Sequence, residues 1–103
     1  MSNNNASPDL PIPISSKAIS KLKEYSELLI YDNKAFIRLG VKKEGAHMKK
    51  VIGVDEKRFT DQAYEMEDIS FVIDRRELKH LEGSRLDFKE TNAQKGFIYR
   101  PVK

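Results

Sequence analysis

The stretch AFIRLGVKKEGAHMKKVIGV, residues 35–54, decides the fold of this chain. Its first seven residues alternate so that one side of an extended chain is aliphatic, the side formed by Ala35, Ile37, Leu39 and Val41. A polar segment around Gly45 follows, and β-branched side chains resume at residues 51–54. This pattern predicts two strands joined by a hairpin-like loop at residues 42–50.

The same alternation predicts further strands toward the C-terminus. Their apolar residues are Tyr64 and Met66, then Ile69, Phe71 and Ile73, then Leu86 and Phe88, and finally Phe97 to Tyr99. A short helix is expected at residues 75–81, and Gly83 is expected to end it in a left-handed turn. Residues 92–96 are expected to turn the chain back before the last strand.

The N-terminal part predicts a tail and then a helix. Residues 1–13 are polar and contain three prolines, so we expect a flexible tail there and a domain spanning residues 14–103. Ser15 or Ser16 is suited to cap a helix of about three turns. Its apolar face contains Ala18, Leu22, Tyr25 and Leu29, and a turn is expected at Asp32–Asn33.

Taken together, these elements predict a mainly β protein of the α+β class, with an N-terminal helix, five or six strands, one short inserted helix and no parallel βαβ unit. With 103 residues, 39% hydrophobic and 34% charged, the chain suits one domain. It has no long apolar run and its first residues lack an export signal, so we expect a cytoplasmic protein without membrane contact.

The absence of cysteine restricts the chemistry more than any other feature of the composition. A chain without thiols forms no disulfide, has no thiolate nucleophile, and cannot bind zinc or an iron-sulfur cluster through cysteines. The formal charge of +3 is a mild basic bias that does not by itself indicate nucleic-acid binding. No phosphate loop, nucleophile elbow or paired acid and base is recognisable, so we do not expect an enzyme.

The sequence Arg38-Leu39-Gly40-Val41, followed by Gly45, resembles the stretch that introduces the first cluster cysteine in the HesB-like family of A-type iron-sulfur cluster carriers. The resemblance spans roughly residues 14–100. It continues through Val72-Ile73-Asp74, Leu78, Leu81-Glu82-Gly83, Leu86-Asp87-Phe88 and Gly96-Phe97.

The resemblance implies a two-sheet pseudobarrel and, in the family, a cluster held between subunits of a dimer by cysteines. Here Ala46 occupies the first cysteine's place, and His47 and Met48 follow it where the family has a small residue and a glycine. After Tyr99 the sequence reads Arg100-Pro101-Val102-Lys103, without the family's Cys-x-Cys. The resemblance therefore implies a related scaffold from which the cluster ligands are missing, so that no cofactor is expected.

Two histidines are candidates for a metal site. His47 lies beside the substituted cysteine position and is the best single ligand for iron or zinc, whereas nothing in the sequence places His80 near it. Oxygen ligands are available from carboxylates without the spacing of a calcium loop: Asp55, Glu56, Asp61, Glu65, Glu67 and Asp68. Ordinary surface histidines and a solvated acidic edge are the preferred interpretation.

Cations flank the loop at Lys42, Lys43, Lys49 and Lys50. They form a candidate anion-binding surface, although lysines at strand edges also prevent sheets from pairing, which is the interpretation that we prefer. Arg38 lies opposite the aliphatic face of its strand, and we expect it to form an ion pair with Asp74 or Asp87.

Three functions follow as hypotheses. The leading one is a non-catalytic HesB-like protein that acts as a binding or regulatory module for iron-sulfur assembly proteins, their clients or a cysteine-bearing relative, alone or as a homodimer. The second is a carrier of mononuclear iron or zinc that uses His47 and carboxylates of either subunit. The third is binding of a polyanion by the lysine-flanked loop, with nucleic acid disfavoured because no aromatic platform accompanies the lysines.

Overall fold

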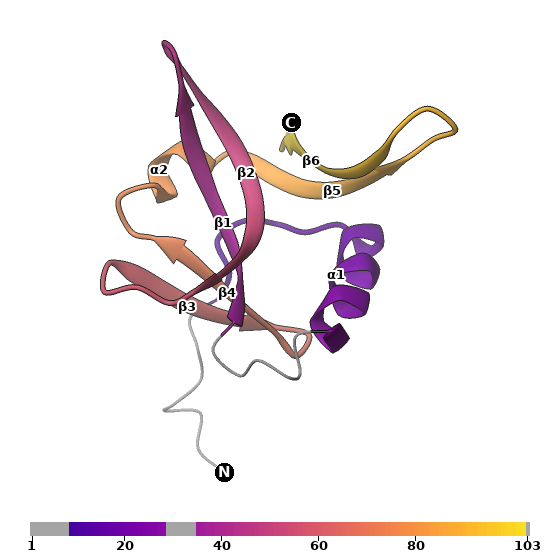
Figure 1. Cartoon of the computed structure of the whole chain (residues 1–103), viewed down its shortest axis with the longest axis horizontal. Helices are drawn as coiled ribbons and strands as arrows, with labels where there is room; N and C mark the ends of the chain where they lie inside the picture. The colour runs from indigo at the N-terminus through magenta and orange to yellow at the C-terminus, as the bar shows by residue number, and fades with distance from the viewer. Residues whose placement is uncertain (1–8, 29–34, 103) are drawn as a thin grey trace.

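The computed structural model describes residues 9–28 and 35–102, and strands dominate its architecture (Figure 1). The elements in chain order are α1 (Ser16–Leu28), β1 (Ala35–Glu44), β2 (His47–Glu56), β3 (Asp61–Met66), β4 (Ile69–Asp74), α2 (Leu78–Leu81), β5 (Ser84–Glu90) and β6 (Lys95–Pro101). The mainly β α+β class, with an N-terminal helix and a short inserted helix, is confirmed.

The strands form two sheets. One has four strands in the order β2-β1-β4-β3, and the other contains β5 and β6. β1 pairs along its whole length with β2 in antiparallel register, and on its other side it pairs parallel with β4 at Ile37–Phe71 and Arg38–Val72. The parallel contact lacks a sequence signature, because the chain returns from β1 to β4 through β2 and β3 rather than through a crossover helix.

The core lies between the sheets and α1, and it is formed by the apolar faces that alternation predicted. Its most deeply buried residues include Leu39, Phe71, Ile73, Leu81 and Leu86, each 1% exposed or less. β1 shows why the alternation was informative, since Ile37 and Leu39 are buried while Phe36 and Arg38 on the other side of the strand are only partly buried. Among the described helices, none is long and apolar enough to cross a membrane.

The N-terminal helix begins as expected and buries less than expected near its end. The Ser15 hydroxyl accepts a hydrogen bond from the Ala18 N–H at 3.1 Å, so Ser15 is the cap. Ala18 and Leu22 are buried, whereas Tyr25 is 45% exposed. Leu29 and the predicted turn at Asp32–Asn33 lie outside the described residues.

The predicted tail of residues 1–13 extends too far into the folded part. Ile12 is only 1% exposed and belongs to the core, and Leu10 packs against it. The Pro13 carbonyl accepts a hydrogen bond from the Leu86 N–H at 2.9 Å, and Ile14 forms a parallel bridge with the same residue of β5. The described end of this segment is therefore part of the domain, which polar composition and prolines concealed.

The inserted helix is shorter than the predicted range 75–81. Residues 75–77 form a turn instead, closed by the Glu77 N–H donating to the Asp74 carbonyl at 2.8 Å. Gly83 has φ +86°, which confirms the left-handed turn after the helix.

At Gly40 a Cβ would lie 2.7 Å from a carboxylate oxygen of Glu77, so this glycine lets Glu77 reach the Val41 N–H at 3.1 Å.

Replacing Ile12 tests whether this segment is structural. We expect Ile12→Ala to lower the free energy of unfolding by about 2–4 kcal/mol, because it opens a cavity in the core. Pro13→Ala, at an exposed position that keeps its backbone carbonyl, should change it by less than about 0.5 kcal/mol. Urea denaturation measures both, and equal effects would contradict the placement of Ile12 in the core.

Candidate functional site

The loop that carries the substituted cysteine position is the exposed tip of the β1–β2 hairpin. Gly45, with φ +59°, and Ala46 form the turn, and every residue from Lys42 to Lys50 is exposed. Figure 1 shows this tip projecting beyond the two sheets. Ala46 therefore offers a methyl group to solvent at the place where the resemblance puts a ligand.

The lysines of the hairpin divide between its two faces. Lys42 pairs directly with Lys49, whereas Lys50 pairs with Val41 and Lys43 with Met48. Side chains of paired residues share a face and successive residues alternate, so Lys42 and Lys49 lie on one face and Lys43 and Lys50 on the other. The like-charged pair is unfavourable and concentrates positive potential at the tip, with Glu44 the nearest acid in the sequence.

The metal candidates are not brought together. His47 pairs in register with Glu44, and both are exposed, so the tip presents one imidazole and one carboxylate. His80 is exposed on α2. Within the described residues no three His, Asp or Glu side chains are arranged to hold a metal ion. Among the described residues, Glu44 is the acid that pairs in register with His47.

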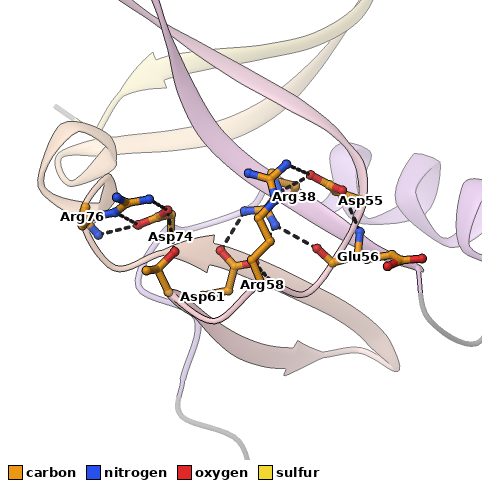
Figure 2. Close-up of polar contacts among 8 residues, drawn as sticks. Arg38, Asp55, Glu56, Arg58, Asp61, Asp74 and Arg76 are labelled. Atoms are coloured by element: carbon orange, nitrogen blue, oxygen red, sulfur yellow. Dashed lines mark hydrogen bonds and ion pairs between the residues drawn. The ribbon is translucent and has the colours of Figure 1, made fainter.

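Two of the acidic residues considered as ligands, Asp55 and Asp61, bind Arg38. Its guanidinium donates two hydrogen bonds to Asp61, at 2.8 and 2.5 Å, and one to Asp55 at 2.9 Å. Figure 2 shows Arg38 between these two carboxylates, with a fourth bond to the Glu56 carbonyl at 3.0 Å. The ion pair expected for Arg38 is therefore confirmed, with Asp55 and Asp61 as its partners in place of Asp74 or Asp87.

Asp61 is fully buried, and no sequence pattern indicated this role. It also accepts the Arg58 N–H at 2.7 Å, so a tight turn before β3 is fixed to the middle of β1. The hydrogen bonds from Arg38 lower the pKa of Asp61 more than burial raises it. Reciprocally, Asp61 raises the pKa of Arg38 above its usual range, so both groups stay charged.

Asp74 and Asp87 have partners of their own. Asp74 binds the Arg76 guanidinium at 2.7 and 3.0 Å and the Thr60 hydroxyl at 2.9 Å, and Arg76 is the main reason that the pKa of Asp74 is lowered. Asp87 accepts the Ser15 hydroxyl at 2.6 Å and the Arg100 guanidinium at 2.9 Å. The Ser15 hydroxyl is the main cause that lowers the pKa of Asp87 to about 2.

Comparison with known proteins identifies the fold and leaves the family open. No family model matches the sequence, and no curated protein matches it. Among solved structures, the chain is similar to a protein from Aquifex aeolicus whose solution NMR structure was determined by the Northeast Structural Genomics Consortium. The two are 19% identical over 97% of this chain and 98% of that one, with a TM-score of 0.64. At this identity the likeness establishes a shared fold.

The buried ion pair predicts a large effect of one substitution. Asp61→Asn removes the buried negative charge that is the main partner of Arg38, and we expect a loss of about 3 kcal/mol in the free energy of unfolding. The control is Glu67→Gln, which removes an exposed pair with Lys23 and should cost less than about 0.5 kcal/mol. Similar small losses in both variants would contradict the importance of the buried pair.

The lowered carboxyl pKa values predict acid sensitivity. Asp55, Asp61, Asp74 and Asp87 have folded pKa values below their unfolded values, so the stability that they contribute is complete at neutral pH and is lost as pH falls through the folded values. We expect the urea midpoint to fall steadily below about pH 4. Asp61→Asn should show a shallower fall, and an unchanged slope would contradict the assignment.

Proposed function

We propose that this chain is a non-catalytic HesB-like protein related to iron-sulfur cluster assembly, which acts as a binding module and does not hold a cluster in the conventional way. Its motif residues support a related scaffold, because most of the apolar ones lie in the core. Leu39, Val72, Ile73, Leu81, Leu86 and Phe88 are all buried. On this proposal the two sheets and α1 correspond to the family's pseudobarrel.

The observation that carries the proposal is the hairpin tip. A chain without cysteine places Ala46 there, exposed to solvent, in a loop whose preceding residues resemble those that introduce the family's first ligand. Iron-sulfur clusters depend on thiolate ligands, which imidazole or carboxylate groups rarely replace completely. A preserved scaffold with this loop altered therefore favours a role in binding assembly proteins, their clients or a cysteine-bearing relative.

A mononuclear iron or zinc carrier is the alternative that concerns the same loop. It requires His47 with carboxylates, and Glu44 is the acid that pairs with His47 in register. Two donors hold a metal weakly, so the site would need the same pair from a second subunit. Asp55 and Asp61 are less suited to join it, because both bind Arg38.

Anaerobic reconstitution with iron and sulfide tests the proposal. We expect a colourless protein with less than about 0.1 iron per chain, because thiolate ligands are missing. Ultraviolet-visible absorption and metal analysis measure the outcome, and a cysteine-bearing HesB-like protein treated identically is the positive control. His47→Ala, at an exposed position, should give the same result as the unaltered chain.

Stoichiometric iron that depends on His47 would overturn the proposal in favour of the metal carrier. Stoichiometric iron retained in His47→Ala would place the ligands elsewhere in the chain and would equally contradict it. To test for a partner, the chain should be mixed with the cysteine-bearing control and examined by size-exclusion chromatography. Co-elution as a mixed dimer would support a module that joins such assemblies.

A further inference from the structure

Outside the hairpin tip, an open groove runs along one side of the molecule between β2 and β6. Two hollows there, of about 250 and 340 Å³, share Ile52 and Phe97 in their lining. A third, of about 280 Å³, is lined by the β5–β6 hairpin alone and shares Phe97 and Ile98 with the second. The apolar lining of the groove comes from α1, β1, β2 and β6 and includes Tyr25, Ile52, Val54, Phe97, Ile98 and Tyr99. Val54 is 56% exposed and Tyr25 45%, so apolar surface remains in water there.

The groove is lined by strand edges and not only by sheet faces. The hollow of 340 Å³ is lined by three consecutive residues of β6, Phe97 to Tyr99. The hollow of 250 Å³ is likewise lined by three consecutive residues of β2, Ile52 to Val54. Successive side chains of a strand point to opposite faces, so only a strand edge exposes three in a row. Both strands are terminal in their sheets, since β2 pairs with β1 alone and β6 with β5 alone.

The register identifies which backbone groups of β2 face the groove. The Val41 N–H donates to Glu77 and is therefore directed away from β2. In an antiparallel sheet, two directly paired residues either both direct their backbone N–H and C=O groups toward each other or both direct them away. Lys50 pairs with Val41, so its N–H and C=O groups point away from β1. The same holds at every second position, which adds Ile52 and Val54. Within the described residues, the backbone groups of these three residues have no hydrogen-bond partner, while the Val51 carbonyl between them accepts the Tyr99 hydroxyl at 2.8 Å.

The charges lining the groove all have one sign. Lys50, Lys89 and Lys95 are its charged lining residues, and Lys95 also approaches Glu90 at 3.4 Å on the exposed rim. Lysines on an edge oppose pairing with a second copy of the same edge, because the lysines of the two copies would repel each other. The same lysines attract a strand that carries carboxylates.

We propose that this groove binds an extended acidic segment of a partner protein, which adds a strand to the β2 edge and places apolar side chains beside Phe97. Main-chain hydrogen bonds to Lys50, Ile52 and Val54 supply affinity, while the hollows and lysines select alternating apolar and acidic side chains. A small molecule fits the open hollows less well, because much of its surface would stay in water. This goes beyond the proposed function and does not depend on the HesB-like resemblance.

Titration of the isotope-labelled full chain with a defined peptide tests this proposal. The probe is an acidic peptide of about eight residues that alternates glutamate with valine, and its counterpart has N-methyl groups on every second amide. We expect the largest NMR shifts at Lys50 to Val54 and at Gly96 to Tyr99, and we expect N-methylation to weaken binding at least about tenfold. Undetectable binding at millimolar peptide, or equal binding of both peptides, would overturn the proposal.

Two neighbouring lysines provide a matched control. Lys50 lines the groove, whereas Lys49 points to the opposite face of the hairpin. We expect Lys50→Glu and Val54→Glu to weaken peptide binding about tenfold and Lys49→Glu less than about twofold. Equal effects of the two lysine substitutions would show diffuse attraction by the hairpin and reject the groove. A cluster-reconstitution result leaves this comparison unaffected, so the two proposals fail separately.

Discussion

The Arg38 guanidinium is the contact on which the arrangement of the strands depends. It lies on the central strand β1, 14% exposed, and binds Asp55 at the end of β2 and the buried Asp61 at the start of β3. A buried pair of this kind gains little over an apolar packing, because removing two charges from water is costly, but breaking it is much worse. The pair therefore favours one strand register over the others, because a shift of β1 by one residue would direct Arg38 into the core.

Fixing β1 in this way determines which edges remain free. β1 is paired on both sides, by β2 along its length and by β4 over a short parallel stretch, so β2 ends the larger sheet. The smaller sheet ends at β6, and the Tyr99 hydroxyl bonds the Val51 carbonyl at 2.8 Å across the space between the two edges. The groove beside Phe97 follows from this arrangement, and a binding role is consistent with a chain that has no cysteine chemistry.

Much of the fold was predictable because a strand with one buried face alternates apolar and polar residues in the sequence. The alternation at Ile37 and Leu39, the cap at Ser15 and the left-handed Gly83 all have local causes, and the structure agrees with each. Ile12 and the parallel β1–β4 contact were missed, because both depend on which segments meet in three dimensions. Arg38 was correctly expected to form an ion pair, but its partners Asp55 and Asp61 were not identified, because they too depend on which segments meet in three dimensions.

The candidate site was likewise predicted only in part. The sequence predicted a loop at residues 42–50, whereas only Gly45 and Ala46 form the turn, because β1 continues to Glu44 and β2 begins at His47. The expected site residues are nevertheless all exposed near the hairpin tip. The sequence did not reveal the groove, since β2 and β6 are separated by about half of the chain and neither carries a motif that points to the other. Asp61 was interpreted as part of a solvated acidic edge, whereas its burial is set by Arg38 on another strand.

Amide hydrogen exchange along β2, measured by NMR on the free protein, tests most directly whether this edge is available. We predict alternating protection, with Val51 and Gly53 exchanging slowly because they bond β1, and Lys50, Ile52 and Val54 exchanging fast because they face the groove. Uniform slow exchange from residue 50 to residue 54 would mean that the edge is already covered. That result would contradict the free edge on which the binding role depends.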